Sequence, residues 1–210
     1  MQNKAKISSH VHRLALNAML AALFFALSLF SVDLGFIKFT VAPLAILVAG
    51  FLFGPADGAI VGLIGSFLEQ FVKYGFSVTM PLWMLPAVVR GALIGLFALF
   101  IRRFLWRRAK ADEHFTPAKP SAQTPLFILL TVAAAILSAI VVTLCNTLPL
   151  YVDYKIFGWS DENPLLWGVL SARFVSGMLT SAVLGVITPL IVMPAAAALE
   201  RMRKGYLWKK

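Results

Sequence analysis

Long blocks of apolar residues, separated by short polar or glycine- and proline-containing stretches, run along almost the whole chain. A helix needs about 20 such residues to cross a bilayer, so the pattern predicts membrane-spanning helices. Six segments qualify, with expected bounds of 14–32, 34–53, 59–72, 81–101, 126–150 and 164–199. The expected fold is an all-α membrane protein, a bundle of six transmembrane helices that forms a single integral membrane domain over 1–210.

Two of these segments have short apolar cores, at 41–53 and 59–72. Helices of this length must tilt, recruit flanking residues such as Leu34 to Thr40, or stop short of one surface, and the last option leaves room for a cavity. The sixth segment contains Pro189 and Pro194, which predict a kink or break near its inner end.

Composition agrees with a membrane protein, because 60% of the residues are hydrophobic and 13% are charged. A soluble domain has about 45–50% apolar and about 25% charged residues. The net charge is +10, and most of the basic residues lie next to apolar spans, at the chain ends and in one linker, 102–124. That distribution favours contact with anionic lipids and argues against nucleic-acid binding.

The lysines and arginines also predict the orientation. With both termini in the cytoplasm, fourteen of the nineteen basic residues lie on the inner side and three on the outer side. Positive charge accumulates on the cytoplasmic side of membrane proteins, so N-in and C-in topology is expected. The two remaining cations, Arg90 and Arg173, fall inside helices.

These two arginines predict a ligand site. Each lies nine residues from the outer end of its segment, about 13 Å deep at 1.5 Å per residue. Asn146, Trp83 and Glu69 are expected at or above the same level. Two cations and one carboxylate leave an excess positive charge, which an incoming carboxylate would balance.

A structural interpretation stays open for every one of these residues. Arg90 could pair with Glu69 and hold the bundle together, and Arg173 could reach toward the surface. Asn146 could bridge helices, and Trp83 could belong to the interfacial aromatic belt. On that interpretation the chain is a structural or assembly protein with arginine-stapled helices.

Catalytic and metal-binding motifs are not found in the sequence. It has no G-x-x-x-x-G-K-[ST] motif, and its three histidines lie in expected cytoplasmic segments. We therefore expect no enzyme activity, no metal and no cofactor. The chain is also small for a self-sufficient secondary transporter, although a stand-alone facilitator stays open as a third possibility.

The first segment contains "ALNAMLAALFFA", in which Ala18, Ala22 and Ala26 recur every four residues. Small residues at this spacing form a smooth stripe on which another helix can pack closely. The stripe predicts a docking face for a partner membrane subunit, with internal packing as the alternative.

Together, the six-segment plan, the alanine stripe and "AGFLFGPADGAIVGLIGSFLEQ" (49–70) resemble the S components of energy-coupling factor (ECF) vitamin transporters. The resemblance covers about 14–203. It implies a subunit that binds a vitamin from outside and docks through its first helix onto a membrane coupling subunit. That subunit carries two cytosolic ATPases, so ATP hydrolysis would belong to the partners.

The stretches "YGFSVTMPLWMLPAVVRG" (74–91) and "LCNTLPLY" (144–151) are most similar to the pantothenate-type members. This similarity implies Trp83, Arg90 and Asn146 as binding residues. Tyr74 and Tyr151, at the ends of the two stretches, are further candidate binding residues. The alternative vitamin is folate, since folate-type members also carry an "NTL" stretch. Those members have an arginine late in the first helix, where this chain reads "LSLFSVDLG".

Overall fold

The computed structural model describes residues 2–33, 38–111, 124–158 and 163–201, which form six α-helices, one short π-helix and a small β-hairpin. The helices are α1 (Gln2–Leu29), α2 (Pro43–Phe53), α3 (Pro55–Tyr74), α4 (Met80–Ala111), α5 (Thr124–Val152) and α6 (Trp167–Arg201). The hairpin strands are β1 (Ser31–Asp33) and β2 (Lys38–Thr40), and the π-helix is η2 (Asp153–Phe157).

The expected helix over 34–53 is wrong in its first part, because β2 occupies Lys38–Thr40 and α2 begins only at Pro43. β1 and β2 pair antiparallel, with Val32 opposite Phe39. β-Branched and aromatic residues favour such strands. Pro43 then begins α2, and proline suits the first helical turn because no hydrogen bond from its nitrogen is needed there.

The linker expected over 102–124 is also too long, because α4 continues to Ala111. The basic residues from Arg102 to Lys110, expected in the linker, therefore belong to the helix. Arginine and lysine are good helix formers. The proline-rich stretch "TPAKPSAQTP", expected to be flexible, lies almost entirely outside the described residues.

A run of small residues holds α3 against α4. A Cβ atom added to Gly91 would lie 2.1 Å from the backbone oxygen of Gly58, and one added to Gly62 would lie 2.4 Å from that of Ala87. One on Gly95 would lie 2.2 Å from the nitrogen of Pro55. The two backbones touch because no side chain separates them, as in other small-residue helix pairs in membranes.

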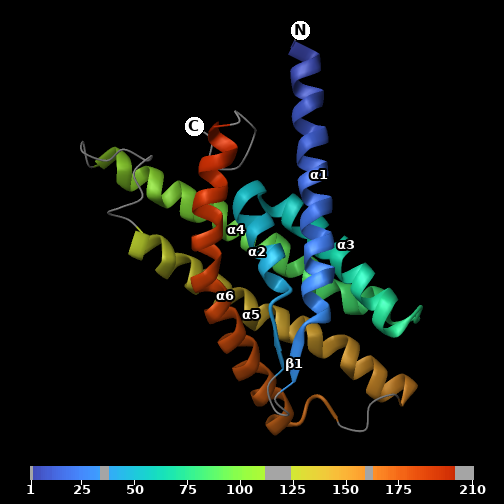
Figure 1. The fold of residues 1–210 in the computed structure, drawn as a ribbon. Coiled ribbons are helices and arrows are strands. Elements are labelled where there is room, and N and C mark those ends of the chain that lie inside the picture. The colour runs from blue at the N-terminus through green and yellow to red at the C-terminus, as the bar shows by residue number, and fades with distance from the viewer. Residues whose placement is uncertain (1, 34–37, 112–123, 159–162, 202–210) are drawn as a thin grey trace.

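Proline does not break α6, which is a single continuous helix although it contains Pro189 and Pro194. Figure 1 shows that the helix changes direction between its orange and its red part, as expected of a proline-containing helix. Thr188 donates a hydrogen bond to the carbonyl oxygen of Leu184 at 2.7 Å in the turn before Pro189.

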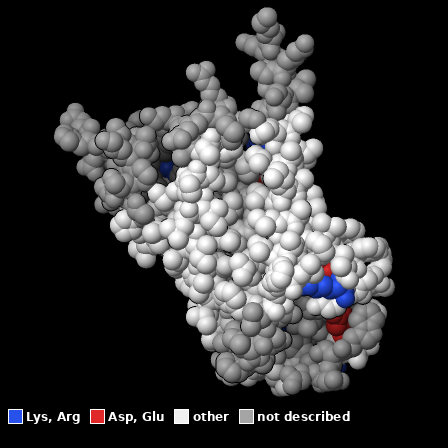
Figure 2. All heavy atoms as spheres, in the orientation of Figure 1, with Lys and Arg blue, Asp and Glu red and all other residues white. Residues whose placement is uncertain are grey.

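Four helices are long and apolar enough to cross a membrane by length and composition, at 11–29, 80–104, 125–157 and 167–196. The start of α1 and the end of α6 lie at the same end of the molecule (Figure 1). Between the two ends the visible face is almost free of charged atoms, apart from a small group at lower right (Figure 2). A surface with few charged atoms suits contact with the apolar interior of a bilayer.

Candidate ligand site between α4, α5 and α6

Trp83 of α4 joins the end of α5 through a hydrogen bond. Its indole Nε1–H donates to Oδ2 of Asp153 at 3.0 Å. Asp153 is the first residue of η2 and is buried, with 8% of its surface exposed. Its second oxygen, Oδ1, is buried and has no hydrogen-bond partner among the described residues.

Arg173 of α6 reaches the same stretch of α5. Its Nη2 lies 3.5 Å from the carbonyl oxygen of Asn146, at the long limit of a hydrogen bond. Its Nη1 is buried and has no partner within the described part of the chain. The guanidinium therefore retains donors that a carboxylate could accept.

The Trp83–Asp153 contact sets the level of Arg90. Arg90 follows Trp83 by seven residues, and Asn146 precedes Asp153 by seven, so each pair shares one helix face. Because α4 and α5 run in opposite directions (Figure 1), Arg90 and Asn146 both lie about 10 Å from the Trp83–Asp153 contact, in the same direction along the two helices. Half-buried Arg90 forms no hydrogen bond or ion pair with another described residue.

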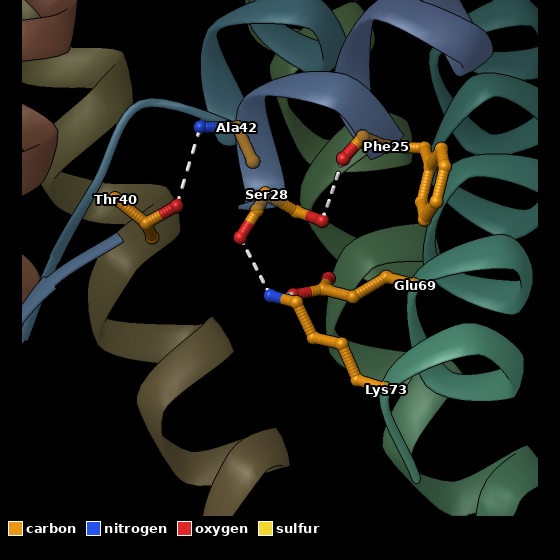
Figure 3. Close-up of polar contacts among 6 residues, drawn as sticks. All are labelled: Phe25, Ser28, Thr40, Ala42, Glu69 and Lys73. Atoms are coloured by element: carbon orange, nitrogen blue, oxygen red, sulfur yellow. Dashed lines mark hydrogen bonds and ion pairs between the residues drawn. The ribbon is translucent and has the colours of Figure 1, made fainter. Parts of the chain in front are cut away.

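Glu69 does not balance either arginine in this structure. Its carboxylate pairs with Lys73, one turn further along α3, at 2.9 Å. Figure 3 shows the Lys73 ammonium between this carboxylate and the backbone oxygen of Ser28, which it reaches at 2.6 Å. A cation at the C-terminal turn of α1 is favourable to the helix dipole, so Lys73 has a structural task.

The two tyrosines make no hydrogen bond to another described residue. Tyr74 ends α3 and is 66% exposed, and Tyr151 lies near the end of α5 and is 37% exposed. The described structure thus brings Arg173 to Asn146 and joins Trp83 to the end of α5 through Asp153, about two helical turns from Asn146. Arg90 shares the face of α4 that carries Trp83. The structure leaves Glu69 in a separate contact.

No group of three or more His, Cys, Asp or Glu residues within the described ranges could hold a metal ion.

The comparisons decide the family. The profile of the family "ECF transporter, substrate-specific component" matches residues 12–192. The chain belongs to this family. The expected S-component identity is confirmed at this level.

A solved structure shares the fold of this S component. It is described as the "structure and mechanism of the S component of a bacterial ECF transporter" and superposes with a TM-score of 0.56. The two sequences are 20% identical over 96% of this chain and 100% of the other. The curated proteins contain no match.

The alanine stripe of the S component lies on the exposed side of α1. Ala18, Ala22 and Ala26 are all exposed, whereas the interior-facing positions of the helix are Asn17, Ala21, Phe24 and Ser28. The alternative of internal packing therefore does not apply within the described chain.

Sequence reasoning missed two polar groups. One is Asp153. The sequence feature that could have revealed it is a carboxylate two helical turns after Asn146, in a largely apolar segment. The other joins α1 to the start of α3: Asn17 donates to Asp57 Oδ1 at 2.6 Å, and Arg13 forms an ion pair with the same carboxylate. The sequence feature that could have revealed this cluster is Asn17, a polar residue one helical turn after Arg13.

Proposed function

We propose that this S component binds pantothenate from the outer side of the bacterial membrane, with Arg90 holding the carboxylate. The observation that carries the proposal is the charge of the site. In the described structure neither Arg90 nor Arg173 has a carboxylate partner, and Glu69 is paired with Lys73.

Counting charges favours a monocarboxylate. Within the candidate site, Arg90 and Arg173 contribute two positive charges and Asp153 contributes one negative charge. Charges inside a membrane protein need to be balanced, and a ligand with a single carboxylate balances this set. Pantothenate has one carboxylate, one amide and two hydroxyl groups, whereas folate has two carboxylates.

Asn146 and Trp83 supply the other contacts that such a ligand needs, a hydrogen-bonding amide and an apolar wall. The Asn146 side-chain amide makes no hydrogen bond to another described residue, so it is free to pair with the amide or a hydroxyl of pantothenate. The indole ring of Trp83 supplies an apolar wall above Arg90. Tyr74 and Tyr151 stay as candidates at the mouth of the site.

Transport would require the partners of an ECF transporter. We propose that the exposed alanine stripe of α1 docks onto the transmembrane coupling subunit, and that two cytosolic ATPases drive uptake. Both termini would lie in the cytoplasm, since the basic residues gather at that end.

Thermal unfolding of the purified protein tests the ligand. A ligand present at 1,000 times its dissociation constant stabilises the folded state by about 4 kcal/mol. We expect pantothenate to raise the unfolding temperature and folate to leave it unchanged. Stabilisation by folate alone would assign the alternative vitamin, and no shift with either would reject both vitamins as ligands.

A further inference from the structure

Asp153 has one hydrogen-bonding oxygen that the protein does not use. Oδ2 accepts the Trp83 N–H at 3.0 Å, while Oδ1 is buried and has no partner among the described residues. A buried carboxylate oxygen without a partner destabilises the folded protein, because it has lost its hydration and gained nothing. Such an atom needs an explanation in a native structure.

The local backbone places this oxygen at a break in helical regularity. Asp153 begins η2, a five-residue π-helical turn that ends at Phe157 and is followed by Gly158, whose φ is +64°. Short π-helical segments within helices occur often at functional sites. The Trp83 contact then fixes one side of the carboxylate, so the direction of Oδ1 is set by the protein in advance.

No basic side chain of the described site neutralises Asp153. Arg173 contacts the Asn146 carbonyl instead, and Arg90 has no partner among the described residues. Along the helix axes, Arg90 and the Asn146 carbonyl that Arg173 contacts both lie about two helical turns, or about 10 Å, from the Trp83–Asp153 contact. The carboxylate therefore lies at one end of a polar strip along α5, and the two guanidinium groups lie toward the other end, Arg90 on α4 and Arg173 on α6.

We infer that Asp153 Oδ1 accepts a hydrogen bond from a hydroxyl or N–H group at the end of the ligand remote from its carboxylate. The inference rests on the proposed function and deepens it by defining the ligand class. The ligand is a monocarboxylate with a hydrogen-bond donor about 10 Å from the carboxylate, a distance that corresponds to two helical turns.

An ionised carboxylate only accepts hydrogen bonds, so it selects for a donor. A ligand that lacks the donor leaves Oδ1 buried and unpaired and is bound more weakly. Hydrogen bonds to charged groups contribute about 1.5–3 kcal/mol, or about 10- to 100-fold in affinity. Asp153 is thus assigned as a residue that determines specificity for the hydroxyl end of pantothenate.

The test compares two ligands and two proteins by calorimetric titration. The ligands are pantothenate and N-(3,3-dimethylbutanoyl)-β-alanine, which keeps the carboxylate and amide but lacks both hydroxyls. The proteins are wild type and Asp153→Asn, since asparagine can still accept the Trp83 N–H but presents an NH₂ group in place of Oδ1. Asp57→Asn is the matched control, because Asp57 is equally buried, with 8% of its surface exposed, and lies in the other cluster.

We expect Asp153→Asn to bind pantothenate at least tenfold more weakly than wild type and to bind the deoxy analogue with unchanged affinity. Unchanged binding of the analogue also reports that the variant is folded. Asp57→Asn should bind both ligands as wild type does.

Three outcomes overturn the inference while leaving the proposed function intact. They are equal binding of pantothenate by wild type and Asp153→Asn, an equal loss for both ligands, and a wild-type protein that does not distinguish the two ligands. A wild-type protein that binds neither ligand instead rejects pantothenate as the substrate, and this inference with it.

Discussion

Arg90 is the residue on which the ligand hypothesis depends most. It is half-buried in α4, and no described carboxylate neutralises it. A charged side chain near the bilayer centre costs about 2.5–3.5 kcal/mol on insertion scales, so a site that keeps one has a use for it. A guanidinium matches a carboxylate because two of its N–H groups point along parallel directions.

We expect Arg90→Ala to weaken pantothenate binding more than tenfold, because a charge-assisted bond contributes about 1.5–3 kcal/mol. Arg90→Lys should recover part of the affinity, since it keeps the charge but loses the fork. Equilibrium titration of the purified variants measures both. Arg103→Ala, at an exposed position near the other end of α4, is the control. Wild-type affinity in Arg90→Ala would make the arginine a structural residue only.

Asp57 offers a second residue-scale prediction. It accepts hydrogen bonds from buried Asn17 and from Arg13, whose side chain is 39% exposed. Removing one partner of a buried charge pair costs about 3–5 kcal/mol. The partial exposure of Arg13 reduces this to about 1–3 kcal/mol, as screening by solvent weakens such pairs.

Asp57→Ala should therefore lower the unfolding temperature by several degrees and leave the pantothenate dissociation constant unchanged. Thermal unfolding in detergent, followed by titration below the transition, separates the two effects. A loss of affinity without a loss of stability would show that this cluster communicates with the ligand site.

At the scale of elements, the contact between α3 and α4 orients the ligand-binding helix. Gly58 and Gly62 of α3 meet Gly91 and Ala87 of α4 backbone to backbone, and Gly95 of α4 lies against Pro55 at the start of α3. This glycine and alanine seam fixes the rotation of α4 about its axis. The rotation in turn determines where Trp83 and Arg90 point, because a helical residue is displaced by a fixed angle from its neighbours.

Gly91→Ala should accordingly destabilise the protein, because the added Cβ would lie 2.1 Å from the Gly58 oxygen and the backbones must separate. Overpacking of this kind typically costs about 1–3 kcal/mol. Gly168→Ala is the control, since nothing lies within 4 Å of its added Cβ. Comparing the unfolding temperatures of the two variants checks the expectation, and equal stability would contradict a rigid seam.

The exposed stripe on α1 leads to a prediction about assembly. Ala22→Trp should prevent association with the coupling subunit, because a large side chain keeps the two helices apart. Pantothenate binding should be unaffected, since Ala22 is exposed and does not pack inside the chain. Co-purification with the coupling subunit measures assembly, and Val186→Trp, at a position of α6 that is 48% exposed, is the control. Normal assembly of Ala22→Trp would contradict the docking role.

At the scale of the whole molecule, the face of the described structure drawn in Figure 2 carries few charged atoms, as expected of a surface in contact with lipid. The family is that of substrate-specific components, which work with separate coupling and ATPase subunits. The chain contains no Walker A motif that could bind ATP for itself.

We expect proteoliposomes that contain this chain alone to bind radiolabelled pantothenate but not to accumulate it. Adding the coupling subunit, the two ATPases and ATP should produce uptake, and Arg90→Ala should abolish it in the same complex. Accumulation by the chain alone would favour a stand-alone facilitator.

The sequence by itself determined the membrane class, the family resemblance and the placement of Arg90 and Arg173 inside helices. These depend on runs of apolar residues and on spacings within one segment, which are local properties. The same local rules missed the β-hairpin before α2, where strand pairing joins residues on either side of a turn.

Only the tertiary structure decided which polar groups meet. Trp83 and Asp153 are 70 positions apart, and Asn17 and Asp57 are 40 apart. Their contacts depend on how helices rotate and cross, which is set by packing features such as the glycine and alanine seam. Glu69 illustrates the difference, because its depth matched the arginines in the sequence while the fold gave it Lys73 as its partner. Depth in a membrane follows from position along a helix, whereas partnership requires knowing which face each helix presents.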